Sequence, residues 1–241
     1  MRIRIITPIV GTGRPRSNPQ EYIERMRRLS NICQDTQLDN VRIDKGPSSI
    51  ESRYDEILAS PSIAKKVVEA EAEGVDAVIV NCFGDPGVRA SRELVEIPVV
   101  GPCESSMLVA ASLSNKFSVA TILKNVIPLI EENARVYGIS SKLVSVRAID
   151  IPVLDLHKDS EMTVDALCRE GKKAIEEDGA EALVLGCTGM TGLAGKISEV
   201  LGVFVVDPLP TALKFAETLV SLGLSHSKIT YPAPPEKIRV E

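Results

Sequence analysis

The chain of 241 residues lacks the features that mark membrane, secreted and nucleic-acid-binding proteins. No apolar stretch approaches the roughly 18 to 20 residues that a membrane helix needs. Residues 1–10 indicate a first strand rather than a signal peptide, because Arg4 interrupts the apolar run and no small-residue cleavage site follows. The net charge is only −5, without any run of five like charges. We therefore expect a cytoplasmic protein with a small-molecule substrate and no nucleic-acid or membrane partner.

Histidine and paired cysteines are also scarce. The only histidines are His157 and His226, and neither has catalytic spacing to another motif, so a Ser-His-Asp or His-metal mechanism is poorly supplied. The cysteines are odd in number and contain no C-x-x-C pair, which argues against a disulfide framework and a zinc ribbon; they are Cys33, Cys82, Cys103, Cys168 and Cys187. We expect reduced thiols, no metal and no organic cofactor.

What the sequence does contain is an alternation of short β-branched runs with longer helical patterns, which is typical of an α/β fold with parallel sheets flanked by helices. We predict strands at 2–9, 41–45, 75–82, 97–101, 117–123, 143–149, 181–187 and 203–207. We predict helices at 19–31, 61–73, 104–114, 124–137, 160–178 and 210–222. Gly74 and Gly138 fall where left-handed caps would end the preceding helices.

The pattern also repeats within the chain. Residues 75–87 (VDAVIVNCFGDPG) align with residues 180–192 (AEALVLGCTGMTG), and this alignment places Cys82 opposite Cys187. IPVVGP at 97–102 then matches VFVVDP at 203–208, and the strand ending at Thr7 matches the strand ending at Thr121. Three matched elements in the same order indicate a duplication.

A duplicated unit predicts two pseudo-symmetric α/β lobes with an active-site cleft between them. The carboxyl ends of the strands would point into this cleft, since ligands of such sheets bind there. We place residues 1–102 and 209–241 in the first lobe and residues 103–208 in the second, with the last helix and tail packing back on the first lobe.

Cys82 and Cys187 are the leading candidates for chemistry. Each follows an apolar strand and precedes a glycine-containing turn that we expect to open a helix. Backbone amides and the positive helix end would lower the thiol pKa, and each site would supply a thiolate near neutral pH. A buried cysteine with only a packing role is the commoner situation after a strand, but it does not explain two matched positions.

Two thiols on opposite sides of one substrate carbon are what racemisation requires, since one face needs a base and the other an acid. The oxyanion formed after proton loss also needs donors. Turn amides are placed to supply them, at Phe83, Gly84, Thr188 and Gly189.

The other candidates are better explained by structural roles. Cys33 and Cys168 lie in helical patterns, and Cys103 starts a helix. Glu51 could line the cleft, although a charge at the start of a helix over 51–58 is the simpler interpretation. Asp85 could cap the helix after Cys82, and Asp207 could close the last strand of the second lobe. The loop 11–16 (GTGRPR) lacks the third glycine of a dinucleotide turn, so it covers a substrate group or is a solvated loop.

Three segments resemble the hydantoin racemase family within the aspartate/glutamate racemase superfamily: GPSSIESRYDE (46–56), NCFGDPGVRASREL (81–94) and LGCTGMTG (185–192). The resemblance covers most of the chain in order. It implies a two-base mechanism without pyridoxal phosphate or metal, with Cys82 and Cys187 as the catalytic pair, usually in a homo-oligomer. It also implies substrate contacts at Pro8, Asn81 and Thr121. The chain departs from the family at Thr7-Pro8-Ile9, where an Asn-Pro-Asn type turn is common.

The substrate therefore stays open. The leading hypothesis is a racemase acting next to a carbonyl in a 5-substituted hydantoin or a related compound such as allantoin. Alternatives with the same fold are an aspartate or glutamate racemase, a maleate-type cis-trans isomerase and an arylmalonate-type decarboxylase. Decarboxylation needs one thiol, so the second cysteine argues against it. A noncatalytic small-molecule binding module is the alternative of a different class.

Overall fold

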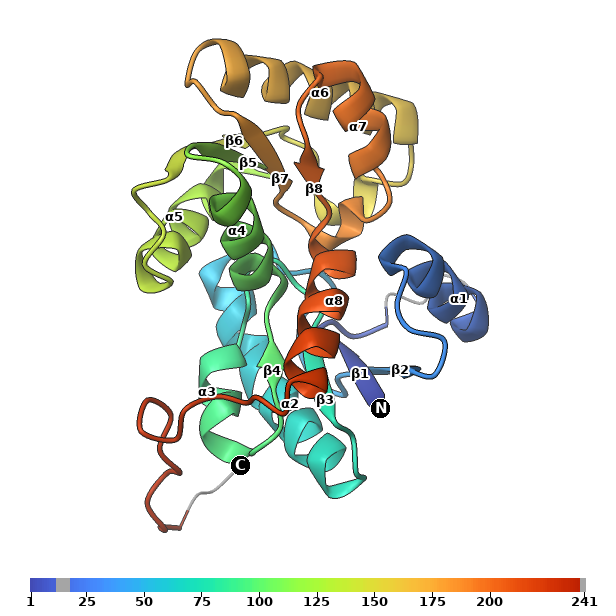
Figure 1. The fold of residues 1–241 in the computed structure, drawn as a ribbon, viewed down its shortest axis with the longest axis vertical. Helices are drawn as coiled ribbons and strands as arrows, with labels where there is room; N and C mark the ends of the chain where they lie inside the picture. Colours follow the sequence, from blue (N-terminus) through green and yellow to red (C-terminus); the bar gives the residue numbers. More distant parts are fainter. Residues whose placement is uncertain (12–17, 239–241) are drawn as a thin grey trace.

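The computed structural model describes residues 1–11 and 18–238, which form two lobes, each built on a four-stranded parallel sheet. Figure 1 draws the second lobe above the first. The first sheet has the order β2-β1-β3-β4, made of β1 (Arg2–Thr7), β2 (Gln37–Arg42), β3 (Ala77–Val80) and β4 (Val99–Val100). The second has the order β6-β5-β7-β8, made of β5 (Phe117–Thr121), β6 (Leu143–Ala148), β7 (Ala182–Leu185) and β8 (Val205–Val206). The predicted α/β class with two lobes is confirmed.

The central strands of the two sheets pair in matching register. Ile6 of β1 lies opposite Val80 of β3, and Ala120 of β5 lies opposite Leu185 of β7. These four strands are largely buried, and β3 (AVIV) and β7 (ALVL) are accordingly apolar throughout. The register places each candidate cysteine two residues beyond the last paired position of its strand.

Helices cover the faces of both sheets (Figure 1). They are α1 (Pro19–Ser30), α2 (Arg53–Ala72), α3 (Val88–Leu94), α4 (Pro102–Leu113), α5 (Ile127–Val136), α6 (Ser160–Glu176), α7 (Ala194–Leu201) and α8 (Pro208–Ser221). Three short 3-10 helices accompany them: η1 (Lys124–Val126), η2 (Val153–Asp155) and η3 (Thr188–Met190). The predicted glycine caps are confirmed, since Gly74 and Gly138 have φ values of 73° and 74° after α2 and α5.

Two helices pass from one lobe to the other. α4 follows β4 of the first sheet, yet its Met107 and Ala110 lie in the core of the second lobe. α8 follows β8 of the second sheet, and its Leu213 packs with Ile5 and Val100 in the first lobe. The two helices pack against each other at the junction of the lobes. The residues at which one lobe gives way to the other stay a prediction.

Several predicted elements need correction. β2 begins at Gln37 rather than at residue 41, because Asp39 in this strand is compensated by ion pairs with Arg2 and Arg4. α2 is one helix from Arg53 to Ala72, although we predicted two helices, at 51–58 and at 61–73. Pro61 lies on the exposed side of α2, where water can bond the carbonyl that loses its partner. The helices expected after the Cys82 and Cys187 turns were given no bounds; they are α3 and α7, and they begin at Val88 and Ala194.

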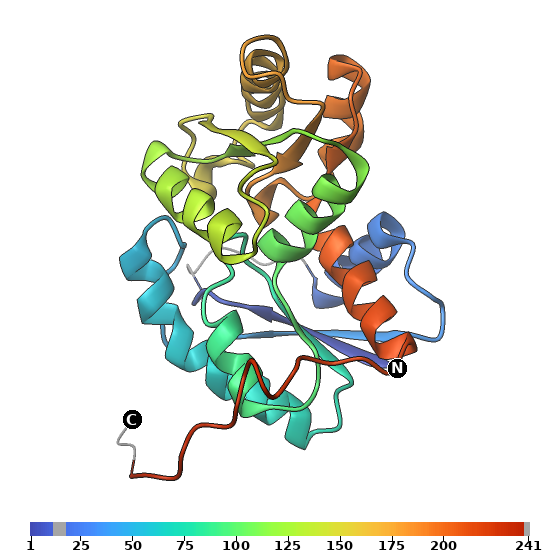
Figure 2. The same cartoon turned by 60° about the vertical axis from the view of Figure 1, so that its left-hand side comes forward.

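Beyond α8 the chain returns along the first lobe, as Figure 2 shows. His226 and the backbone amide of Val99 are joined by a hydrogen bond of 2.9 Å, and Lys228 donates to the carbonyl of Arg92 at 3.0 Å. In the part of the chain that the structure describes, no helix has the length and apolar character needed to cross a bilayer.

Candidate active site

A cavity of about 510 Å³ lies between the lobes, where the carboxyl ends of β1, β3, β5 and β7 meet. All nine site residues predicted from the sequence line this cavity: Pro8, Asn81, Cys82, Phe83, Gly84, Thr121, Cys187, Thr188 and Gly189. They come from equivalent segments of the two lobes because the sheets share one strand order. The sequence repeat thus brings both cysteines to a single cavity.

Cys187 lies at the start of η3. Its sulfur accepts a hydrogen bond from the Gly189 amide at 3.3 Å. Burial raises the pKa of this thiol to about 11, while the Gly189 and Met190 amides act in the opposite direction and the negative charge of Glu51 adds to the rise.

Cys82 lies in a turn after β3 and accepts a backbone hydrogen bond from Gly84. Burial raises the pKa of this thiol well above its usual value, and the neighbouring Cys187, Glu56 and Asp85 raise it further. The two cysteines are therefore half-buried, free thiols within electrostatic reach of each other.

The expected helix ends at the cysteines are wrong, and so is the expected lowering of the pKa of the two thiols. α3 begins only at Val88, and a single 3-10 turn rather than an α-helix follows Cys187. With one or two amide donors and no helix dipole, desolvation dominates the pKa of both thiols. The Gly84 and Gly189 amides, expected to bind a substrate oxyanion, instead donate to the two sulfurs.

Polar groups surround the thiols. The Thr188 hydroxyl donates to the Asn81 carbonyl at 3.3 Å, and the Thr121 hydroxyl donates to the Gly186 carbonyl at 3.2 Å. Asn81 donates through Nδ2 to the Tyr22 hydroxyl at 3.2 Å, while its Oδ1 is buried without a hydrogen-bond partner. A buried acceptor with no partner is costly, and a bound donor would relieve that cost.

The family is decided by comparison with known proteins. The model described as Asp/Glu/Hydantoin racemase matches residues 15–216. A hydantoin racemase of Pseudomonas sp. (strain NS671) is 43% identical over 238 residues, which are 98% of this chain and 93% of that protein. The chain belongs to the Asp/Glu/hydantoin racemase family. The isomerase class predicted from the sequence is confirmed.

Two solved structures resemble this racemase along its whole length. The allantoin racemase from Klebsiella pneumoniae superposes with a TM-score of 0.90 at 32% identity, covering 100% of this chain and 96% of that one. The allantoin racemase from Pseudomonas fluorescens superposes with a TM-score of 0.90 at 33% identity, covering 100% of both chains. The fold of the racemase, including the relation between its lobes, is thus shared with proteins of the same reaction class.

Two acidic residues of the racemase, Asp85 and Glu51, have roles that the sequence did not predict, and a third lies where it was predicted. Asp85 does not cap α3; its carboxylate accepts from the Cys103 and Glu104 amides at 3.0 and 2.9 Å and so caps α4. Glu51 does not serve the start of α2, which Ser52 caps; it accepts from the Val153 amide of the other lobe at 2.7 Å. Asp207 follows β8, as predicted, and accepts from the Gly192 amide at 2.5 Å.

The other cysteines do not line the cavity, although Cys103 lies within electrostatic reach of Cys82. Cys33 is exposed beyond the end of α1 rather than in a helix, whereas Cys168 lies in α6 and Cys103 is buried in α4. Of the loop 11–16, all but Gly11 lies outside the described residues.

Within residues 1–11 and 18–238, no group of three or more His, Cys, Asp or Glu side chains could hold a metal ion.

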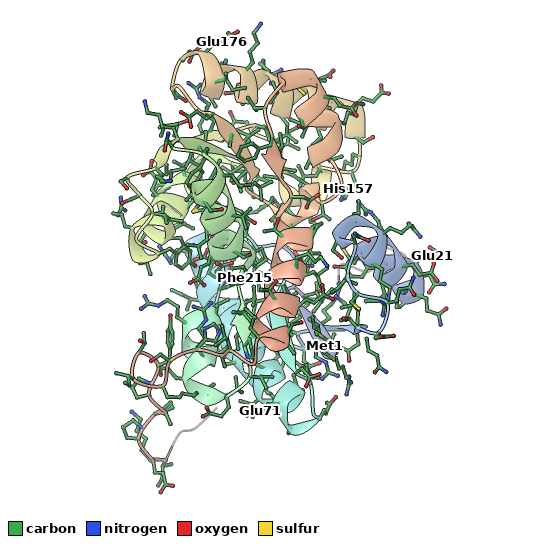
Figure 3. All side chains as sticks on the ribbon, in the orientation of Figure 1. Met1, Glu21, Glu71, His157, Glu176 and Phe215 are labelled. Carbon is green, nitrogen blue, oxygen red and sulfur yellow. The ribbon has the colours of Figure 1, made fainter. Side chains whose placement is uncertain are left out.

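Sequence reasoning missed much of the cavity wall of the racemase. The missed polar residues are Tyr22, Arg25, Arg42, Ser52, Glu56, His157 and Thr191, and the missed apolar ones include Ile50, Ile122, Val126, Leu129, Ile130 and Val153. His157, labelled in Figure 3, lies on the second lobe near α1. Tyr22 and Met26 occupy one face of a helix, so their spacing was a usable signal. Glu56 ends the segment 46–56 that resembles the hydantoin racemase family, and this was the signal that could have found it.

Proposed function

We propose that this protein is a cofactor-independent racemase that inverts the carbon next to a carbonyl in a 5-substituted hydantoin or a related compound such as allantoin. The observation that carries the proposal is the pair Cys82 and Cys187, which follow equivalent strands of two duplicated lobes and line one cavity. The family and the named activities of the relatives agree with it.

The proposed mechanism uses both thiols. The thiolate of one cysteine takes the proton from the substrate carbon, so that a C–H bond breaks and an S–H bond forms. The other thiol then gives its proton to the opposite face, which leaves its sulfur as the thiolate. The charge that develops on the substrate oxygen is held by turn amides, of which those of Phe83 and Thr188 are the proposed donors.

A hydantoin ring suits the polar groups of this cavity. The ring carries N–H donors and carbonyl acceptors, and the unpartnered Oδ1 of Asn81 offers an acceptor for one of these donors. Pro8 and Thr121 contribute to the walls at the ends of β1 and β5. The aliphatic wall of the second lobe, with Ile122, Val126 and Ile130, would receive the 5-substituent.

Incubation of the protein with single enantiomers tests this function. Optical rotation should decay to zero with a 5-substituted hydantoin or allantoin and remain constant with aspartate or glutamate. Extensive dialysis and a chelator should leave the rate unchanged. Racemisation of amino acids only, restoration of lost activity by zinc or pyridoxal phosphate, or binding without any turnover would each reject the proposal.

We also propose that the chain works in the cytoplasm as a homo-oligomer. The resemblance to the family supports the assembly. Light scattering after size-exclusion chromatography tests it, since a mass equal to that of one chain at working concentration would contradict it.

A further inference from the structure

Glu56 is the acidic side chain of the cavity wall that lies closest to one cysteine turn. It points inward from the first turns of α2, and only 7% of the residue is exposed. Its carboxylate presses on Gly84, because a Cβ built on that glycine would stand 2.3 Å from Oε1. Gly84 is also the residue whose amide donates to the Cys82 sulfur. The carboxylate therefore lies directly behind the turn that holds one of the two thiols.

The surroundings of the two sulfurs differ in a way that the repeat does not predict. Cys187 has backbone donors from Gly189 and Met190, and the nearby Glu51 carboxylate is bound to the Val153 amide. Cys82 has one donor, from Gly84, and faces Glu56, Asp85 and Cys187. Donors favour a thiolate, and adjacent negative charges disfavour it.

The charge of Glu56 is only partly compensated. Arg53 pairs with it at 3.2 Å, but this arginine also pairs with Glu132 of α5, and 46% of its side chain is exposed. Asp55 on the same helix and Glu132 add negative charge, and burial raises the pKa of Glu56 to about 7. At the alkaline pH where a thiol ionises, Glu56 is an anion.

We infer that the Glu56 carboxylate keeps the proton on Cys82, so that Cys187 carries the thiolate with which a catalytic cycle begins. The inference rests on the function proposed above. Glu56 acts through Cys82 and is a positioning residue for its proton. The resting protein thus deprotonates directly the enantiomer whose hydrogen faces Cys187.

Alkylation with iodoacetamide tests the inference without a substrate. The rate at each cysteine is read by peptide mass spectrometry at one slightly alkaline pH. Cys187 should react faster than Cys82 in the unmodified protein, because only thiolates react. Glu56→Gln should speed alkylation of Cys82 about tenfold, the effect of one pKa unit. It should leave Cys187 unchanged.

A second variant should change the alkylation rate of Cys82 in the opposite direction. Arg53→Gln leaves the carboxylate without its counter-charge and should slow alkylation of Cys82. Circular dichroism shows whether Glu56→Gln is folded. If it is not, Arg53→Gln still tests the inference, because 46% of the Arg53 side chain is exposed and its replacement should not disturb the fold. Glu131→Gln, which removes an equal charge from an exposed position of α5, is the matched control and should change neither rate.

The inference is overturned if Cys82 reacts faster than Cys187 in the unmodified protein. It is also overturned if Glu56→Gln changes both cysteines equally or neither. These outcomes are independent of turnover. A protein that shows the expected alkylation pattern and racemises no hydantoin or allantoin would reject the proposed function and keep the assignment of the proton.

Discussion

The hydroxyl of Thr188 donates a hydrogen bond of 3.3 Å to the carbonyl oxygen of Asn81. Thr188 directly follows one cysteine of the cavity, and Asn81 directly precedes the other. The bond therefore joins the two thiol-bearing turns across the lobes and fixes their separation independently of the strands. This hydrogen bond has no counterpart on the other side of the pseudo-symmetric pair, because the residue of the first lobe that corresponds to Thr188 is Phe83, which has no hydroxyl.

Replacement of Thr188 by Val should lower kcat/KM for both enantiomers about fivefold, since a hydrogen bond of this kind contributes about 1 kcal/mol. Thr188→Ser keeps the hydroxyl and should retain most of the activity. Initial rates on each pure enantiomer provide the measurement. Equal loss in the Val and Ser variants would show that the methyl group, not the bond, matters.

Replacement of Cys82 or Cys187 by Ser should abolish racemisation, because a hydroxyl does not ionise in the working range. Each variant should still exchange the hydrogen of one enantiomer in deuterium oxide, and the two variants should prefer opposite enantiomers. NMR of the separated enantiomers measures the exchange. Full racemisation by either variant would assign the chemistry to another residue.

Replacement of Gly84 by Ala should destabilise the protein by about 1 to 3 kcal/mol, because the new methyl group meets the Glu56 carboxylate at 2.3 Å. The Cys82 turn must also move to make room for the methyl group. The folded variant should therefore have lower racemase activity than the unmodified protein. Gly195→Ala in α7 is the control: nothing lies within 4 Å of its Cβ position, and alanine favours the helix. Urea unfolding compares the two variants, and equal stabilities would remove the proposed clash.

Asp85 should give the free energy of unfolding a measurable pH dependence. Burial raises the pKa of this carboxyl to about 7, against two amide donors and the Tyr137 hydroxyl. A folded pKa above the unfolded value stabilises the protein at low pH, and this contribution is lost as the pH rises from about 4 to about 7. Asp85→Asn removes the titration and should be most destabilised, relative to the unmodified protein, at the acidic end.

Urea unfolding of both proteins at several pH values tests this expectation. The difference between them should shrink by about 1.4 kcal/mol for each pH unit within that window. A difference that stays constant, or that grows as the pH rises, would show that Asp85 is ionised throughout and that its amide donors outweigh its burial.

The architecture was largely predictable because the central strands of both sheets are buried, so they are mainly apolar and their repeat is visible in the sequence. β2 was misplaced for the opposite reason. Its Asp39 is a polar residue in a strand, and the arginines that compensate it lie in β1, far away in the sequence. A local pattern cannot show such a partner.

The residues of the cavity also divide into those that a local sequence pattern could predict and those that it could not. Cys82 and Cys187 were predictable because they follow matched strands, and the ends of parallel strands meet at one edge. Asn81 and Thr121 came from the resemblance to the racemase family. Glu56 was not predicted from the strand pattern, because it enters the cavity from the side of α2 and not from the end of a strand. The pKa of the thiols could not be predicted either, since burial, which the sequence does not give, outweighs the local amides.

The return of α8 to the first lobe has a consequence for synthesis. Leu213 and Ala216 complete the core around Ile3 and Ile5, yet they are translated more than 200 residues later. Strands β5 to β8 and the helices between them leave the ribosome before α8 does. The first lobe is therefore synthesised first but completes its core last. Until α8 has been made, the face of β1 and β3 that α8 covers stays exposed.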